Sequence, residues 1–468
     1  SFVWIKRRVT PLEAQQVAAL DLPGIAFTPE YLRVYPNLDL ASALLGFTGV
    51  DTQGLEGSEY AFDSYLKGAE GIKVIDKDAL GRTLLYSDED TPTGGGSVRL
   101  TLNPEIQFIA EQALERAVQG TRADVGVAIV MRSRTGELLA VAQAPAFNPN
   151  AYGDYDKGLF FDRAITDGYE PGSVFKIVTA SVALEEKIVT PQTMIYCEQG
   201  QFKNYDSVIH DVEPQGWLNL AGILRVSSNI GAAKVGLLVP ASVFHEYLLR
   251  FGFGQRVGIF VAPDGRRLAG EADGYVLPAD KWTPVDHAAI AFGHGVLVSP
   301  LQMITAANTI ATGGLLLHPY LVQEIRDARG RVVERDQPKV MRRVISPATA
   351  ALVRDYMEGV VGDGGTGTRA AVPGYLVAGK TGTTERYDLL ARGYSKTRDI
   401  ASFVGFVPAD KPELTVLVLV QDPKVSRYGG QAAAPVFREI VQRSLPLLGV
   451  WPDTVKHIPL GQGTAQAN

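Results

Sequence analysis

The sequence is poor in cysteine and has no long apolar run. Its only cysteine, Cys197, cannot form an internal disulfide bond and lies in no zinc-type spacing. No apolar stretch approaches the roughly 20 residues that a membrane-spanning helix needs. The six histidines include no H-E-x-x-H pair and no other close ligand spacing. These absences argue against a disulfide scaffold, and they predict a protein that uses neither a metal ion nor another cofactor.

A strong excess of charge of one sign is also missing. The chain has 45 Lys and Arg against 51 Asp and Glu, which gives a net charge of -6. So mild a balance does not suggest a nucleic-acid partner. With 46% hydrophobic and 21% charged residues, the composition is that of a globular protein. The 468 residues exceed the roughly 250–300 at which a single core stops growing, so we expect at least two domains.

The best linker candidate is the polar stretch 87–97, which contains three consecutive glycines. We therefore predict an N-terminal domain over residues 1–95, a second domain over residues 96–448 and a polar tail over residues 449–468. The chain opens at Ser1 without a methionine. We expect that a targeting or anchoring segment was trimmed from this end.

Hydrophobic periodicity predicts an α+β fold for the second domain. Residues 104–118 have the spacing of an amphipathic helix, and residues 125–131 and 137–142 read as a hairpin. The middle of the domain is largely helical. Further helices are expected at residues 59–67, 288–295, 300–311, 347–361 and 433–448, and strands at residues 322–325, 332–335, 377–383, 401–407 and 414–420.

One stretch combines a turn with the start of a helix and two reactive side chains. Pro171 and Gly172 break the chain, and Ser173 to Lys176 then open an apolar helical segment. Residues three apart lie on one helix face, so the amine of Lys176 can reach the hydroxyl of Ser173. We predict Ser173 as the nucleophile and Lys176 as its base. The spacing alone is weak, because Ser64 and Lys67 repeat it and a surface pair is the simpler interpretation of either match.

Two further patterns follow in fixed order. Ser227-Ser228-Asn229 is the only S-x-N sequence and lies between two helical segments, where a helix cap is the simpler interpretation. We predict that Ser227 relays a proton and that Asn229 orients Lys176 and holds a substrate amide. Lys380 belongs to the only K-T-G sequence, on a predicted strand. Its charge would repel the proton on Lys176 and favour the neutral amine.

The predicted strand also has the features of a substrate-binding edge. Gly382 has no Cβ, so an extended peptide could lie close to the strand and pair with it. Thr381 and Thr383 are two residues apart on one face, and with Lys380 they could bind a terminal carboxylate. The backbone N–H groups of Ser173 and Thr383 would form the oxyanion hole.

With these three patterns in this order, the sequence resembles the penicillin-recognising serine enzymes, and most of all a class B penicillin-binding protein of the division-specific group. Residues 22–25, 33–36 and 54–57 are similar to the N-terminal pedestal of that family, and residues 402–409 to its division-specific members. The resemblance implies the penicillin-binding transpeptidase fold. That fold has an antiparallel sheet flanked by helices, an all-helical subdomain and a smaller, elongated pedestal.

The resemblance also implies a reaction. Ser173 would attack the D-Ala-D-Ala bond of a peptidoglycan stem peptide, release the last D-alanine and pass the acyl group to an amine of a neighbouring stem. β-Lactams would acylate the same serine. The implied partners are a lipid-linked glycan polymerase and other division proteins. The implied location is the extracytoplasmic face of the bacterial membrane, with an N-terminal helix as the anchor.

Several other functions share these signatures. An elongation-specific transpeptidase uses the same site, and a D,D-carboxypeptidase replaces the acceptor amine with water. A β-lactamase or penicillin sensor would not need the pedestal, and a non-catalytic division scaffold would not need the three motifs. His294, between two glycines, is interpreted as structural. The glycine-rich loop at residues 364–367 lacks the spacing of a phosphate-binding loop.

Overall fold

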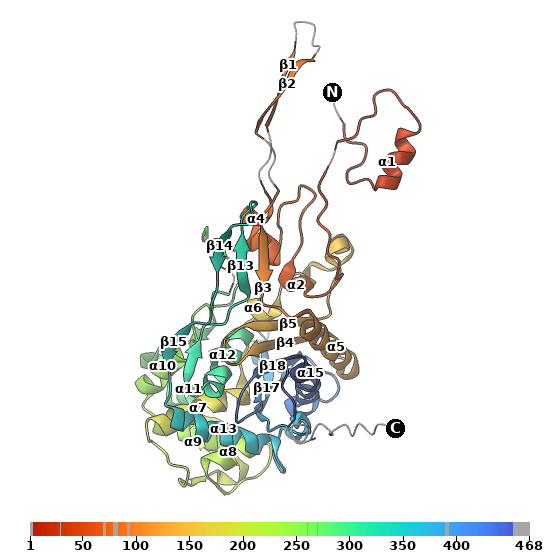
Figure 1. Cartoon of the computed structure of the whole chain (residues 1–468). Helices are drawn as coiled ribbons and strands as arrows, with labels where there is room; N and C mark the ends of the chain where they lie inside the picture. The colour runs from red at the N-terminus through yellow and green to blue at the C-terminus, as the bar shows by residue number, and fades with distance from the viewer. Residues whose placement is uncertain are drawn as a thin grey trace, which may run out of the picture.

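The computed structural model describes residues 3–28, 30–68, 72–77, 83–90, 94–259, 261–268, 270–388 and 393–452 (Figure 1). It confirms the predicted α+β class, with helices packed around an antiparallel sheet. The hairpin β1–β2 and helix α1 project beyond the main body at the N-terminal end (Figure 1). None of the helices in these ranges is long and apolar enough to span a membrane.

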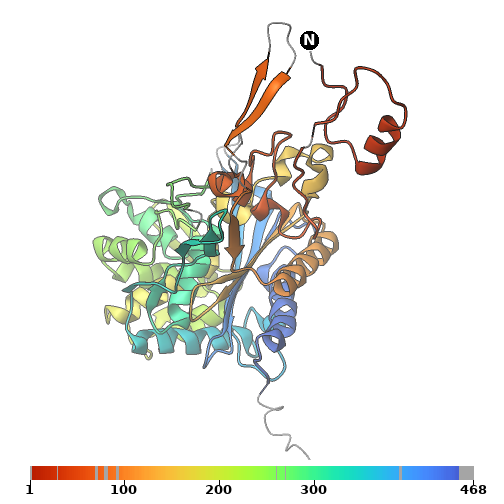
Figure 2. The same cartoon turned by 45° about the horizontal axis from the view of Figure 1, so that its top comes forward.

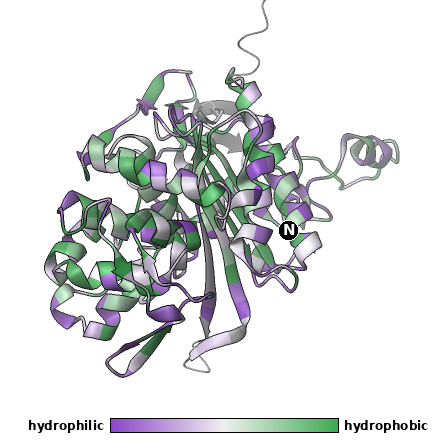
Figure 3. Ribbon diagram, turned by 90° about the horizontal axis from the view of Figure 1, so that it is seen from below, coloured by the Kyte–Doolittle hydropathy of each residue, from purple (hydrophilic) through white to green (hydrophobic). Residues whose placement is uncertain are grey.

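A five-stranded antiparallel sheet forms the centre of the molecule, in the order β16-β17-β18-β4-β5. All eight residues of β18 are buried, as expected of a strand that is paired on both sides and covered on both faces. In the view from below, the strands at the centre are largely hydrophobic (Figure 3). The strand bounds are Ala378–Asp388, Gly393–Val407, Leu414–Gln421, Val125–Arg132 and Leu138–Ala144.

Helices cover the two faces of this sheet with two separate cores (Figure 2). On one face lie α5 (Pro104–Thr121) and α15 (Ala434–Leu447), where Phe403 of β17 contacts Phe437 at 4.7 Å between ring centroids. The other face is covered by a group of helices, of which α12 and α13 contact the sheet directly. These are α7 (Lys176–Glu185), α8 (Leu220–Val226), α9 (Asn229–Leu238), α10 (Ala241–Arg250), α11 (Pro284–Ile290), α12 (Pro300–Ala311) and α13 (Pro347–Val361).

The N-terminal residues form short helices and strands. Strand β3 (Ser97–Leu100) joins β13 (Val322–Arg326) and β14 (Val332–Arg335) in a three-stranded sheet, which ties this region to the body. The remaining N-terminal elements are α1 (Pro11–Ala18), α2 (Ser42–Leu45), α3 (Gly57–Ala61), α4 (Asp63–Leu66), β1 (Ile72–Lys77) and β2 (Thr83–Asp90). Small two-stranded ladders complete the body: β6 (Ile195–Tyr196) with β9 (Trp217–Leu218), β7 (Gln201–Asn204) with β8 (Ser207–His210), β10 (Tyr275–Val276) with β11 (Val296–Leu297), and β12 (Leu315–Leu317) with β15 (Val340–Arg343).

The predicted linker is wrong in part. Residues 87–90 belong to β2. Gly95 and Gly96 pack against α4, and Gly96 N donates to Tyr65 O at 2.7 Å. A Cβ on Gly95 would lie only 1.8 Å from Leu66 O. Glycine is therefore required here by close packing of backbones rather than by freedom of rotation.

Two predicted helices also differ from the structure. The helix expected at residues 59–67 is broken into α3 and α4 at Phe62, whose side chain is fully buried. The helix expected at residues 288–295 instead begins at Pro284 and ends at Ile290. Its capping box at Thr283 and the proline at its first position are start signals that the apolar spacing did not capture. Helices α12 and α13 have the predicted bounds. Residues 453–468 of the predicted tail lie outside the described residues.

Candidate active site

Ser173 lies in a tight 3₁₀ turn (Gly172–Phe175) that runs directly into α7. Gly172 has a φ of +55°, and a Cβ there would lie 2.0 Å from Thr384 Oγ1, so only glycine fits. Its N–H donates to Gly293 O at 3.0 Å. Val174 and Phe175 are fully buried, whereas Ser173 is half-buried and lines a cleft. The turn therefore presents the serine hydroxyl to the cleft from a rigid base.

Lys176, one turn later, is 1% exposed. Its Nζ donates to Ser227 O at 2.6 Å, to Asn229 Oδ1 at 2.7 Å and to Ser227 Oγ at 3.3 Å. In the part of the chain that the structure describes, the hydroxyl of Ser173 makes no hydrogen bond within the usual limits. Ser173 thus lines the cleft, and Lys176 lies buried behind the cleft wall, where the S-x-N segment holds it.

Lys380 contacts the hydroxyl of Ser227, as Lys176 does. It is completely buried in β16, and its Nζ donates to Ser227 Oγ at 2.9 Å and to Thr381 O at 2.9 Å. Ser227 Oγ therefore lies between two lysine amines. Ser227 itself sits at the C-cap of α8 with a φ of 63°, a left-handed conformation that turns the chain sharply before α9 begins. Three segments far apart in the sequence meet at this hydroxyl.

Burial changes the protonation of both lysines. It is the main cause that lowers the pKa of Lys176 to about 7, and the nearby Asp211 carboxylate acts in the opposite direction. Burial, followed by repulsion from Lys176, holds the pKa of Lys380 well below its ordinary value. Loss of contact with water is therefore the main cause of both lowered pKa values, ahead of charge repulsion. The sequence alone could not show this burial. A lysine with a pKa near neutrality can accept a proton at physiological pH.

Strand β16 lies at the edge of the sheet, and its residues Thr381 and Thr383 line the cleft. Thr381 Oγ1 lies 2.7 Å from Thr366 Oγ1, and Thr383 Oγ1 accepts from Gly429 N at 3.1 Å. Packing within the chain is a further reason for glycine at position 382, because a Cβ there would lie 2.3 Å from Ser402 Oγ. The close approach of a peptide to Gly382 stays a prediction.

The cleft has a volume of about 580 Å³. One wall is the S-x-N segment and the chain after β8, and the other is β16 with the loop before it. The polar residues around Ser173 include those predicted from the sequence, apart from the two lysines buried behind the wall. The cleft is lined by residues that include Ser173, Asp211, Ser227, Ser228, Asn229, His294, Thr366, Thr381, Gly382 and Thr383.

His294 lies in the loop after α11 and also lines the cleft. Burial, with a smaller contribution from the charge of Lys176, lowers its pKa to about 4. The ring is therefore neutral at pH 7, and it lies tilted beside the ring of Tyr394, with centroids 5.6 Å apart. The preceding Gly293 supports the turn of the serine through its carbonyl.

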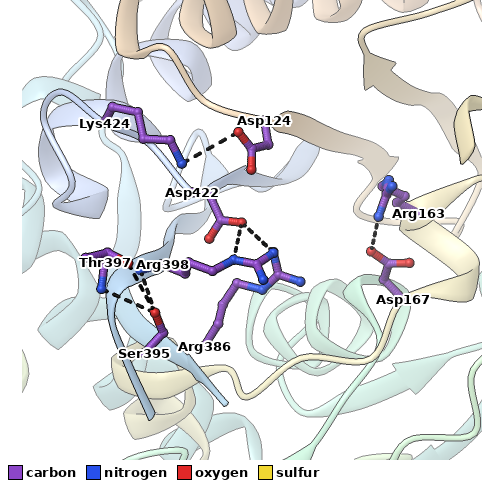
Figure 4. Close-up of polar contacts among 9 residues, drawn as sticks. All are labelled: Asp124, Arg163, Asp167, Arg386, Ser395, Thr397, Arg398, Asp422 and Lys424. Carbon is purple, nitrogen blue, oxygen red and sulfur yellow. Dashed lines mark hydrogen bonds and ion pairs between the residues drawn. The ribbon is translucent and has the colours of Figure 1, made fainter. Parts of the chain in front are cut away.

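The far end of β16 and β17 is held by two aspartates that are almost completely buried. Asp422 accepts from Arg386 Nη1 at 2.5 Å and from Arg398 Nη2 at 3.1 Å (Figure 4). Asp399 accepts from Arg427 Nη2 at 2.9 Å. Hydrogen bonds between charged groups are the strong ones, so these pairs fix the direction of the strand that carries Lys380.

Sequence reasoning missed Asp211 and Thr366. Asp211 directly follows β8 and reaches residues that lie 17 to 19 positions later in the chain. No motif or periodicity marks such a contact in a single sequence. Thr366 lies in the glycine-rich loop at residues 364–367, for which the sequence predicts no catalytic or binding role. The second S-x-x-K match is structural, because Ser64 Oγ donates to Asp264 Oδ2 at 2.6 Å and is exposed.

Two protein-family models match the chain. The penicillin-binding protein dimerisation domain matches residues 2–100, and the penicillin-binding protein transpeptidase domain matches residues 126–442. The chain belongs to the penicillin-binding protein transpeptidases. The family, the fold and the transpeptidase enzyme class predicted from the sequence are confirmed.

Relatives of this penicillin-binding transpeptidase extend over most of its length. Stage V sporulation protein D of Bacillus subtilis is 35% identical over 95% of this chain and 69% of its own. The peptidoglycan D,D-transpeptidase FtsI of Escherichia coli K12 is 31% identical over 97% and 74%. The structure of penicillin-binding protein 3 from Mycobacterium tuberculosis complexed with ampicillin is 29% identical, with a TM-score of 0.79 and 93% of each chain covered.

Proposed function

We propose that this penicillin-binding transpeptidase cross-links peptidoglycan stem peptides through an acyl-enzyme on Ser173. The observation that carries the proposal is the position of Ser227 Oγ, between the buried amines of Lys176 and Lys380 and beside the cleft that Ser173 enters. A hydroxyl between two amines of lowered pKa is suited to moving protons without a metal ion.

The chemistry follows from these positions. Neutral Lys176 takes the proton of Ser173 Oγ as the oxygen attacks the carbonyl carbon of the penultimate D-alanine. The backbone N–H groups of Ser173 and Thr383 stabilise the oxyanion. Collapse of the tetrahedral intermediate breaks the C–N bond, and the departing D-alanine amine takes a proton through Ser227. The amine of a second stem then attacks the ester, loses its proton along the same path and restores Ser173.

The edge strand β16 would bind the substrate. Thr381 and Thr383 offer hydroxyls on the cleft side of β16, and Lys380 lies behind them, so together they suit the terminal carboxylate of the donor. Asn229 holds the donor amide while it orients Lys176. β-Lactams, which carry a carboxylate and an acylating carbonyl, would occupy the same positions and acylate Ser173.

The wider role rests on the relatives. Similarity to FtsI and to a sporulation protein supports a role in septal wall synthesis, beside a lipid-linked glycan polymerase and other division proteins. We place the protein on the extracytoplasmic face of the membrane, anchored by an N-terminal helix. The pedestal would comprise residues 1–95 and the catalytic domain residues 96–448.

The direct test offers a D-Ala-D-Ala stem peptide together with an acceptor amine and separates the products by mass. Transpeptidation predicts a cross-linked product that increases with acceptor concentration and is absent in Ser173→Ala. Only the shortened peptide, whatever the acceptor concentration, would indicate a D,D-carboxypeptidase. No turnover of peptide and no covalent penicillin adduct would indicate a non-catalytic scaffold.

A further inference from the structure

Asp211 connects a hairpin outside the three motifs to the catalytic lysine. The hairpin β7–β8 ends at His210, and the next side chain, Asp211, lines the cleft. Asp211 Oδ2 accepts from Ser228 Oγ at 2.6 Å, and Oδ1 accepts from Asn229 N at 2.5 Å and from Ile230 N at 3.0 Å. One carboxylate therefore binds three donors of the S-x-N segment and the start of α9.

These contacts complete the cap of α9. The N–H of Gly231 is satisfied by Ser228 Oγ at 2.9 Å, and Asp211 satisfies the two N–H groups before it. A carboxylate at the N-terminus of a helix also interacts favourably with the helix dipole. Asn229, as the first residue of α9, is thereby fixed in its backbone position.

The same hairpin fixes the side chain of Asn229. Its Nδ2 donates to His210 O at 3.0 Å, so Oδ1 must face the other way, where it accepts from Lys176 Nζ at 2.7 Å. Two consecutive residues, His210 and Asp211, thus determine where the amide acceptor of Lys176 lies. The charge of Asp211 acts on Lys176 as well, because it favours the protonated amine against the effect of burial.

We infer that Asp211 is a positioning residue of the transpeptidase reaction, which holds Asn229 and Ser228 so that Lys176 is aligned for proton transfer to and from Ser173. The inference rests on the proposed function, since it assigns Asp211 a role through Lys176. It also makes the β7–β8 hairpin part of the catalytic apparatus, although none of the three motifs lies on it.

Three titratable groups face Lys176 from different elements: Asp211 after β8, His294 after α11 and Lys380 on β16. Only Asp211 carries a negative charge. Without that charge, the protonated form of Lys176 loses an attraction and its pKa falls. Neutral Lys176 would then be available at lower pH, so the acidic limb of the acylation profile would move to lower pH.

The experiment measures the second-order rate constant for acylation by a chromogenic β-lactam across pH, in the wild type, Asp211→Ala and Asp211→Asn. We expect Asp211→Ala to slow acylation at pH 7.5 by about 10- to 100-fold, since a misplaced proton acceptor costs that much. Asp211→Asn retains one acceptor oxygen and should lose less. Both variants should move the acidic limb to lower pH, which a loss of folded protein alone would not do.

The control is Asp206→Asn, which removes the same charge from an exposed position in the turn of the same hairpin. It should match the wild type in rate and pH limb. Asp211 variants with an unchanged rate, or slower variants whose limb does not move, would overturn the inference while an acylated wild type preserves the proposed function. If the wild type is not acylated, both the inference and the proposed function are contradicted.

Discussion

The catalytic site and the N-terminal region differ in how far their side chains are buried. In the cleft, Lys176 and Lys380 are buried and each amine has protein acceptors. In the N-terminal region, helix α1 buries none of its residues, and Ile5 and Tyr31 are 82% and 85% exposed. The cleft is therefore held by contacts within the chain, whereas the outer N-terminal residues are exposed and contribute little to the hydrophobic core.

The largest effect is expected from a substitution of Lys176, which is buried at the catalytic site. Lys176→Met keeps much of the side-chain volume and removes the amine, so acylation by a β-lactam should slow by about 10²- to 10⁴-fold. Its thermal stability at pH 7 should not fall, because the burial of an amine opposes folding. The exposed Lys67, in the second S-x-x-K match, supplies the control. Equal rates in Lys176→Met and Lys67→Met would contradict the assignment of the base.

The inner part of the N-terminal region should behave as core. Phe62 is fully buried in the main hydrophobic cluster, so Phe62→Ala should cost about 3–5 kcal/mol of unfolding free energy. Urea unfolding followed by tryptophan fluorescence measures this loss. Phe27→Ala, at a position 48% exposed, should cost about 0.5 kcal/mol or less. Similar losses in the two variants would mean that the boundary between core and outer surface is misplaced.

The pH dependence tests the burial of the lysines. Because the pKa of Lys176 is lowered to about 7, acylation should fall about tenfold per pH unit below that value as the base becomes protonated. In the unfolded chain, the same lysine keeps its proton up to its ordinary value of 10.5. The unfolded state therefore binds more protons between these values, and this lysine's contribution to stability increases with pH across the window. A flat rate between pH 5 and 8 would contradict the account.

The smallest effect is expected on α1. Leu12 is 64% exposed, so Leu12→Ser should change the unfolding free energy by about 0.5 kcal/mol or less and leave the acylation rate unchanged. A clear loss of stability would show that this face packs against another part of the same chain.

The sequence predicted the cleft better than the N-terminal region for a physical reason. Ser173, Ser227 and Lys380 stand in short motifs whose spacing is set by local geometry, and helix α13 follows a clear apolar period. Asp211 could not be found, because its role depends on a contact between a hairpin and a later helix.

The N-terminal errors have a related cause. The glycines at 94–96 look like a flexible linker in the sequence, but Gly95 and Gly96 are held by close backbone contacts with α4. The break at Phe62 likewise follows from burial of its side chain rather than from a local stop signal. Secondary-structure propensity describes one segment at a time, whereas these features depend on contacts between two segments.

The most direct test of the central claim is intact-mass and peptide-mapping mass spectrometry after treatment with benzylpenicillin. The account predicts one adduct of the whole penicillin on Ser173 that persists for hours, remains in Ser64→Ala and is absent in Ser173→Ala. No adduct on the wild type, or an adduct that survives in Ser173→Ala, would contradict it.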